Sequence, residues 1–249
     1  MPQGYGQYCP FSLAVELLCQ RWTLLVVSSM TFGGRRFSEI QRGVPTMSPS
    51  LLSKRLSDLE EAGLVETREL DSGRGREYLL TPAGRDLEPI IGSLAVWGQQ
   101  WARDMEDDDL DPAFLLWSLH LRIDTAAMPP GQTVIELAFS GAPADRSRFW
   151  LVCRDGEVEM CLKDPELDVD LAVASDLRLF VEAWRGFRDL RREIEEGRIE
   201  LHGPRRLREQ FPRWLLLHPQ AAYERRRPGL ERELAHSRTR PKKASGASR

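Results

Sequence analysis

The sequence predicts an α+β protein that is divided into two domains. In roughly the first hundred residues apolar side chains recur at helical spacing, whereas from residue 133 onward they alternate in runs typical of strands. Between these regions lies the acidic run EDDDLD, which resists packing because like charges repel, and the length of 249 residues suits two domains. We expect a first domain over residues 1–105, an acidic linker over 106–111, a second domain over 112–222 and a basic, disordered tail over 223–249.

The composition narrows the classes of function. With 35 basic and 38 acidic residues the net charge is −3, so any binding to nucleic acid must be local. No uncharged stretch reaches the ~18 apolar residues of a membrane span, and the N-terminus does not resemble a secretory signal, so we expect a cytoplasmic protein that does not bind membranes. The four cysteines form no CxxC pair and no zinc-ligand spacing with histidine, so we expect no metal site.

Capping residues divide the start of the chain into short helices. Ser38 is the expected cap of a brief third helix. Ser48 is the expected cap of a fourth helix, which begins at Pro49 and stops at Gly63. Two short capped helices joined by a tight turn predict a helix-turn-helix. The four expected helices span residues 11–22, 23–32, 39–42 and 50–62.

The fourth expected helix has the two faces that a DNA-recognition helix needs. Leu52, Leu56 and Leu59 share one narrow stripe, which we expect to be buried. The opposite face starts with small polar side chains, which let the N-terminal turns approach base edges in the major groove. Any amphipathic surface helix also has a polar face, so this feature alone does not establish DNA binding. The candidate groove contacts are Ser48, Ser50, Ser53 and Lys54, with Arg36 and Arg55 as further candidates for phosphate contacts.

A hairpin is predicted directly after these helices. Strand-like runs over residues 64–70 and 77–81 are joined by the glycine-rich turn DSGRGR. Arg74 and Arg76 lie in this turn, where they can meet the phosphate backbone or the minor groove. A hairpin that follows a helix-turn-helix in this order is the wing of a winged helix.

The same residues resemble the HxlR family of bacterial winged-helix transcription regulators. The likeness covers residues 8–103 and includes the Cys-Pro near the N-terminus, the F-S-E-I and S-P-S-L-L-S-x-R-L helices, and the T-P-x-G after the wing. Gln20-Arg21 departs from the Gly-Lys that is usual before the tryptophan in this family. The resemblance implies a homodimer that binds double-stranded DNA at a two-fold operator.

A longer helix is expected after the wing, capped by Thr81 and beginning at Pro82. Its apolar residues follow a spacing of three and four, which suits packing against a second copy or within one chain. Dimerisation through this seam rests partly on the family resemblance. The seam residues are Leu87, Ile90, Leu94, Trp97 and Trp101.

Cys9 is a candidate redox sensor. In parts of the HxlR family a cysteine at the Cys-Pro position senses oxidants, and the start of a helix lowers a thiol pKa. Inert packing is the alternative interpretation. Cys19, inside an apolar helix, is expected to be a core residue.

The second domain is expected to contain an antiparallel sheet covered by helices. Asp155-Gly156 predicts a two-residue hairpin turn, which would place Cys153 and Cys161 on opposite faces, too far apart for a disulfide. Expected helices span residues 112–127, 176–187, 190–197 and 204–217, and expected strands span 133–140, 148–155, 157–163, 168–175 and 198–203.

This order of elements resembles the sterol carrier protein type-two fold, as do the segments D-V-D-L-A-V and E-E-G-R-I-E-L-H-G-P. The resemblance implies, loosely, a small apolar ligand. Large aromatic side chains could line its cavity, although such residues are more often plain core. The candidate pocket residues are Trp117, Phe139, Trp150, Phe180, Trp184 and Trp214.

No catalytic motif supports an enzyme. The sequence has no GxSxG, GxxxxGK[ST] or HExxH, its four histidines are isolated, and we expect no cofactor. The prediction is therefore a homodimeric DNA-binding transcription regulator, with a small apolar ligand as its effector or a second domain that stabilises the dimer. The alternative is a hydrophobic-ligand binding protein whose winged helix mediates protein contacts.

Overall fold

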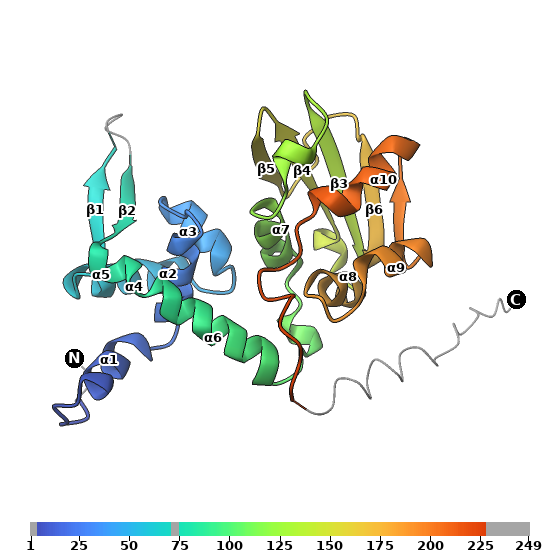
Figure 1. Ribbon diagram of the computed structural model, residues 1–249. Coiled ribbons are helices and arrows are strands. Elements are labelled where there is room, and N and C mark those ends of the chain that lie inside the picture. Colours follow the sequence, from blue (N-terminus) through green and yellow to red (C-terminus); the bar gives the residue numbers. More distant parts are fainter. Residues whose placement is uncertain (1–3, 71–74, 228–249) are drawn as a thin grey trace, which may run out of the picture.

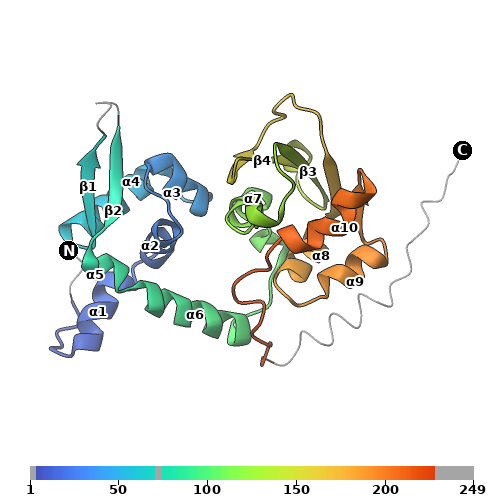
Figure 2. The ribbon, with the colours of Figure 1, turned by 45° about the horizontal axis from the view of Figure 1, so that its top comes forward.

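The computed structural model describes residues 4–70 and 75–227. Two parts of the chain, the first and the second domain, each have their own apolar core and are joined by helix α6, Glu88–Trp101 (Figure 1). Figure 2 shows from another direction that α6 reaches from one domain to the other. In the described residues no single helix is long and apolar enough to cross a membrane, whereas α1 and α2 meet that test only as a pair bent by 82°.

Four helices form the body of the first domain. Leu52, Leu56 and Leu59 are buried, as predicted. The first helix ends before Trp22, inside the expected range, and Trp22 itself has the left-handed φ of 78°, which a right-handed helix cannot include. The helices are α1 Pro10–Leu18, α2 Thr23–Thr31, α3 Phe37–Gly43 and α4 Pro49–Glu61.

Local side-chain contacts fix where these helices begin. Ser48 caps α4, as predicted, by accepting the backbone N–H of Leu51 at 3.3 Å. The expected cap at Ser38 is wrong: the N-cap of α3 is Arg36, because the Glu39 carboxylate accepts its backbone N–H at 3.0 Å. Thr81 caps only the single turn of α5, Pro82–Arg85, so the expected longer helix is divided and α6 begins separately.

The predicted wing is present as β1, Val65–Glu69, and β2, Arg76–Leu80, which pair antiparallel. The chain before α3 extends this hairpin. The backbone N–H of Tyr78 donates to the carbonyl of Arg35 at 2.8 Å. The backbones of Arg36 and Glu77 form an isolated antiparallel β-bridge. The helix-turn-helix and the wing are thus joined by backbone hydrogen bonds.

The second domain follows a short 3-10 turn, η1, Asp107–Asp109. Its helices are α7 Pro112–His120, α8 Leu177–Trp184, α9 Leu190–Glu195 and α10 Arg205–Trp214. Its strands are β3 Thr133–Ser140, β4 Arg148–Arg154, β5 Glu157–Cys161, β6 Leu171–Asp176 and β7 Ile199–His202, with 3-10 turns η2 Thr125–Ala127 and η3 Ala144–Arg146. The first and last helices are shorter than expected, and the order of the principal helices and strands is the predicted one.

The sheet has the strand order β5-β4-β3-β6-β7. The expectation of an antiparallel sheet is wrong at one place, since β3 and β6 are parallel. The long segment after β5 returns the chain to the start of β3, where Asp170 exchanges hydrogen bonds with the Val134 backbone. The hairpin at Asp155-Gly156 is confirmed, with Cys153 opposite Val158 and Trp150 opposite Cys161.

One face of the sheet carries the core of the second domain. Odd-numbered residues of the three central strands, such as Ile135, Phe149 and Val173, are buried with Phe180 and Trp214 from the helices. Figures 1 and 2 show the helices of this domain gathered on one side of the sheet. The sheet and its helices form the scaffold that contacts the far end of α6.

Candidate nucleic-acid interface

The N-terminal turns of α4 present a small polar surface. Ser48, Ser50, Ser53 and Lys54 are all exposed. The Ser48 hydroxyl lies 3.3 Å from the Ser50 hydroxyl. Because three of these four side chains are short, the edge of a base can approach the helix closely. The structure therefore brings all four predicted groove residues to one exposed end of α4.

Lys54 and Arg55 are neighbours in the sequence but lie in different surroundings. Lys54 is 68% exposed, and its ammonium lies 3.0 Å from a carboxylate oxygen of Asp58. An exposed pair of this kind is worth only about 0.3–0.5 kcal/mol, so a phosphate or a guanine can replace it. Arg55 is 11% exposed and donates to the side chains of Gln20 and Asp58. The structure argues against Arg55 as a phosphate contact, because it joins α4 to the turn before α2.

Gln20 is a positioning residue that the sequence analysis did not assign. Its side-chain oxygen accepts from Arg55, and its amide nitrogen donates to the carbonyl of Glu16 at 3.3 Å. Glycine, which is usual at this place in the HxlR family, has no side chain that could make either bond. The departure from the family pattern at Gln20 therefore indicated a side chain with a specific role. The sequence did not show that its partner would be Arg55.

Basic side chains gather beside the wing. Arg76 is exposed at the start of β2. Arg36 is exposed at the start of α3, and its backbone β-bridge with Glu77 places it next to β2. Arg68 on β1 is also exposed, 3.3 Å from Glu66. Arg74, the other predicted wing contact, lies outside the described residues.

Glu39 holds the start of α3 in place. Burial raises the pKa of its carboxyl, but the backbone N–H groups of Arg36 and Arg35, with the charges of Arg36 and Arg42, outweigh this and lower the pKa below its ordinary value. The ionised carboxylate accepts both N–H groups at 3.0 Å. It therefore orients the segment that presents Arg36 beside the wing.

The predicted dimer seam lies on α6 with one exception. Ile90, Leu94, Trp97 and Trp101 are 43–59% exposed, a large apolar surface for one helix. Leu87 is buried in the core of the first domain and does not belong to this surface. We call these four exposed residues the α6 apolar face.

Cys9 is exposed at the N-cap of α1. The backbone N–H groups of Ser12 and Phe11 lower the pKa of its thiol, which favours the reactive thiolate. Cys19 is also exposed, so its expected place in the core is wrong. Cys153 and Cys161 are free thiols, in agreement with the expectation that they form no disulfide.

The six candidate pocket residues are all buried, none more than 9% exposed. Phe139 and Phe180 make an edge-to-face contact at 5.2 Å between ring centroids. The indole N–H groups of Trp184 and Trp214 each donate to a backbone carbonyl at 3.0 Å. A hollow of about 560 Å³ exists beside α9 and α10, but other residues line it, among them Phe187, Leu190 and Leu217. These contacts are those of core side chains.

Comparisons with known proteins identify the first domain. A family model described as HxlR-like helix-turn-helix matches residues 17–106. The uncharacterized HTH-type transcriptional regulator YvaP of Bacillus subtilis is 38% identical over 112 residues, which are 44% of this chain and 96% of that protein. The chain belongs to the HxlR-like helix-turn-helix family.

Two further proteins are similar to part of this HxlR-like chain. An uncharacterized HTH-type transcriptional regulator of Methanothermobacter thermautotrophicus is 32% identical over 106 residues, which are 42% of this chain and 81% of that protein. The reduced form of the transcriptional regulator YodB from Bacillus subtilis is 29% identical, with a TM-score of 0.36, and covers 40% of this chain and 100% of that one.

Membership in the family gives the general function. The chain is a transcriptional regulator of the winged-helix type. The match to the family model ends at residue 106 and does not reach the second domain. The resemblance of that domain to sterol carrier proteins stays a prediction.

Proposed function

We propose that this HxlR-like protein is a homodimer that reads a two-fold DNA operator. The observation that carries the proposal is the exposed N-terminal end of α4 beside the basic side chains of the wing. Ser50, Ser53 and Lys54 would meet base edges in the major groove, and Ser48 would meet the groove at the cap. Arg36 and Arg76 would meet phosphate, and Arg74 completes the proposed wing contact.

The α6 apolar face supports the proposed dimer. Burying two copies of Ile90, Leu94, Trp97 and Trp101 against each other would remove a large apolar area from water, at about 25 cal/mol per Å². A two-fold pair of helices also gives two recognition helices the symmetry of a palindromic half-site pair.

Binding by variants of the full-length protein tests this assignment. The DNA is the motif recovered from a pool of random duplexes. We expect Lys54→Gln to weaken binding and relax preference for the half-site, because it removes a base contact worth about 1–3 kcal/mol. We expect Arg76→Glu to weaken binding to all sequences and to flatten the dependence on salt.

The matched control is Arg213→Glu. It makes the same charge change as Arg76→Glu, on an exposed arginine of α10 in the second domain. If Lys54→Gln and Arg76→Glu bind DNA as the control does while remaining folded, the proposed interface is wrong. Retained oligomeric state and unchanged circular dichroism establish that the variants are folded.

The structure gives no support for the small apolar ligand that the sequence suggested. The six aromatic residues that suggested it are packed in the protein, and Trp117 touches the first domain through Phe32. The alternative of a ligand-binding protein that makes only protein contacts predicts DNA binding without sequence preference, or no DNA binding.

A further inference from the structure

The end of α6 is held by chain that belongs to the second domain. The last carbonyls of a helix have no partner within it and carry partial negative charge. Here the backbone N–H groups of Arg226 and Arg227 both donate to the carbonyl of Gln100 at 3.0 Å. These two residues follow α10 and were expected to belong to a disordered tail. The part of that tail up to residue 227 is instead an ordered strap across α6.

Two arginine side chains complete this attachment. Arg225 is 10% exposed and donates to the carbonyls of Gln99 and Ala102, and it lies 2.5 Å from Asp104. Arg185, at the end of α8, donates to the Gln99 side chain at 2.6 Å and accepts from it through its own carbonyl at 3.2 Å. Gln99 is only 2% exposed. We call Arg185 and Arg225 the α6 clasp.

The clasp gathers two like charges at one place, which requires compensation. Burial, and then the positive charge of Arg225, lower the pKa of the Arg185 guanidinium. The negative end of α6 and the carboxylate of Asp104 offset this repulsion. Because the clasp residues are shielded from water, these contacts are worth more than ordinary surface ion pairs.

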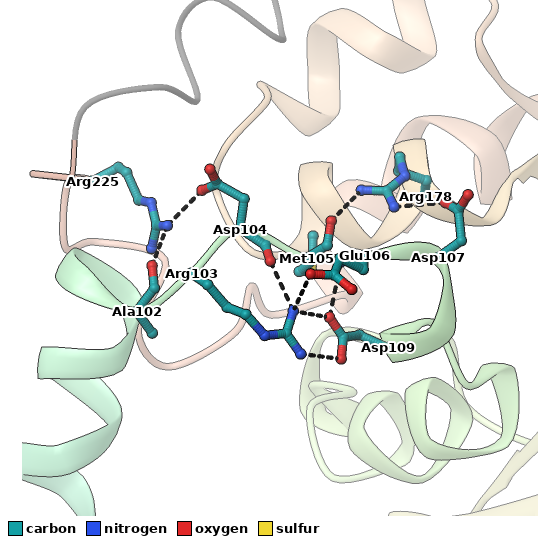
Figure 3. A network of polar contacts seen from close by, with 9 residues as sticks. All are labelled: Ala102, Arg103, Asp104, Met105, Glu106, Asp107, Asp109, Arg178 and Arg225. Atoms are coloured by element: carbon teal, nitrogen blue, oxygen red, sulfur yellow. Dashed lines mark hydrogen bonds and ion pairs between the residues drawn. The ribbon is translucent and has the colours of Figure 1, made fainter.

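The acidic linker is fixed as well, as Figure 3 shows. Arg103 donates to both carboxylate oxygens of Asp109, at 2.5 and 2.7 Å. Arg178 of α8 donates to the carbonyl of Met105 at 3.0 Å and to Asp107 at 2.7 Å. Two of the charges that were expected to repel one another, Asp107 and Asp109, are thus paired with arginines from the two sides of the linker, and Asp111 caps α7. The linker therefore does not act as a free hinge between α6 and α8.

A second contact joins the two domains away from the clasp. The Trp117 ring of α7 packs edge-on against Phe32 at 6.1 Å between centroids. Gly43, at the end of α3, approaches Trp117 so closely that an added Cβ would lie 3.0 Å from its ring. The α6 clasp and the Trp117 contact together fix the orientation of the second domain relative to the first. Either contact alone would let the second domain rotate. The second domain thus touches both α6 and the helix that precedes the recognition helix.

We propose that Arg185 and Arg225 are specificity-determining positioning residues, which set the direction of α6 and thereby the spacing of operator half-sites that the dimer accepts. This inference rests on the proposed dimer and its operator. The α6 apolar face would pair with a second copy, so a change in the direction of α6 relative to α4 moves the two recognition helices with respect to each other. One base pair of spacing is about 3.4 Å along the DNA.

The test measures spacing with full-length protein. Duplexes carry the selected half-sites at the preferred separation, or with one base pair inserted or removed. Wild-type protein should prefer the selected spacing. In Arg225→Ala this preference should fall by about fivefold or more, the usual lower end of coupling between sites, while the dimer persists. Arg225→Lys keeps the charge but loses the fork of donors, so it should show a smaller fall.

Arg226→Ala is the matched control. It removes the same charge from the next residue of the strap, whose side chain is exposed and whose contact with α6 is through its backbone. It should keep the wild-type preference. If Arg225→Ala and Arg225→Lys also keep it, or if Arg226→Ala loses it equally, the inference is overturned.

Amide hydrogen exchange separates failure of this inference from failure of the proposed function. If wild-type protein selects no two-fold motif, the proposed function fails. The clasp is then tested alone: the amides of Gln99 to Asp109 should exchange faster in Arg225→Ala than in Arg226→Ala. Equal exchange in both variants contradicts the clasp irrespective of DNA binding.

Discussion

Two adjacent basic side chains of α4, Lys54 and Arg55, differ in exposure and in their partners. Lys54 is exposed with a weak partner, whereas Arg55 is mostly shielded from solvent by its contacts with Gln20 and Asp58. In the sequence both were candidate DNA contacts, Lys54 for the groove and Arg55 for phosphate. Their different roles come from one glutamine that lies 35 residues earlier in the chain. Charge in a sequence therefore indicates a possible phosphate contact, and burial decides whether the contact can form.

We expect Cys9 to be the more reactive of the thiols at Cys9 and Cys153. Backbone N–H groups of Ser12 and Phe11 lower the pKa of this exposed thiol, while burial raises the pKa of Cys153 to about 11. Alkylation with iodoacetamide near neutral pH should therefore modify Cys9 well before Cys153. Mass spectrometry of the labelled peptides gives both rates. Cys9→Ser should remove the faster modification, and Cys161→Ser should leave it; equal rates at Cys9 and Cys153 would refute the prediction.

His218 gives a prediction about pH. Burial, and then the charges of Arg185 and Arg122, lower its pKa to about 4, against about 6.5 in an unfolded chain. Between these values the unfolded chain binds a proton that the folded chain does not, so the free energy of unfolding falls as the pH falls. The contribution of neutral, buried His218 to the free energy of unfolding is fully present above about pH 6.5. It is lost as the pH falls toward 4, by up to about 3 kcal/mol.

Urea unfolding at about pH 7 and about pH 5 measures this effect. His218→Asn cannot gain the proton but can still accept the backbone N–H of Gln220, which His218 accepts at 3.3 Å. The loss of stability between the two pH values should be smaller in His218→Asn than in wild type. The exposed His202→Asn serves as the control, and the prediction fails if both variants lose as much as wild type.

Among the elements, those defined by nearby residues were predicted best. The α4 helix follows from Ser48, Pro49 and its leucine stripe, all within a few turns. The β4–β5 hairpin follows from Asp155-Gly156. The parallel pairing of β6 with β3 could not be predicted from nearby residues. Residues 162–170 lie between β5 and β6, and a connection of that length lets β6 pair either with β5 or with β3.

Partners that are distant in the sequence explain why two further segments differ from their predictions. The acidic run was expected to stay unpacked, but Arg178, far along the chain, binds Asp107. Residues 223–227 were expected to be disordered, but three of them, residues 225–227, donate hydrogen bonds to carbonyls at the end of α6. For each of these segments disorder or lack of packing was predicted from the charge of the segment alone. In the structure, groups of opposite charge or helix carbonyls from elsewhere in the fold stabilise it.

The α6 apolar face gives a prediction for an element. Trp97 is 59% exposed, so Trp97→Glu should leave the fold of one chain intact and place a charge in the proposed dimer interface. Sedimentation at micromolar concentration should show a monomer. Ala95→Glu adds the same charge on α6 away from this face and should remain a dimer. A dimer in both variants would place the interface elsewhere.

Gly43 gives a prediction about packing between elements. A Cβ here would overlap the Ser29 hydroxyl, which donates to the carbonyl of Ile40, and would press on Trp117. Gly43→Ala should destabilise the protein by about 1–3 kcal/mol. In Gly92→Ala the new Cβ meets nothing within 4 Å, so this change on α6 should be neutral or stabilising by up to about 1 kcal/mol. Denaturant midpoints test both, and equal effects would contradict the close approach at Gly43.

In this protein a DNA-binding domain of the HxlR-like family is joined to a second domain both by α6 and by side-chain contacts between the two. Contacts at Trp117 and at the α6 clasp fix the two domains in one orientation. In the proposed dimer each second domain would therefore follow the direction of its own α6. A signal that altered the second domain would have a direct route to the recognition helices.

The most direct measurement is selection of DNA from a pool of random duplexes by the purified full-length protein, at two salt concentrations, followed by sequencing. The proposed function predicts a two-fold motif whose half-sites lie about one helical turn apart, with binding that weakens only modestly at the higher salt because few phosphates are contacted. Binding without sequence preference that disappears at the higher salt, or no binding, would contradict it.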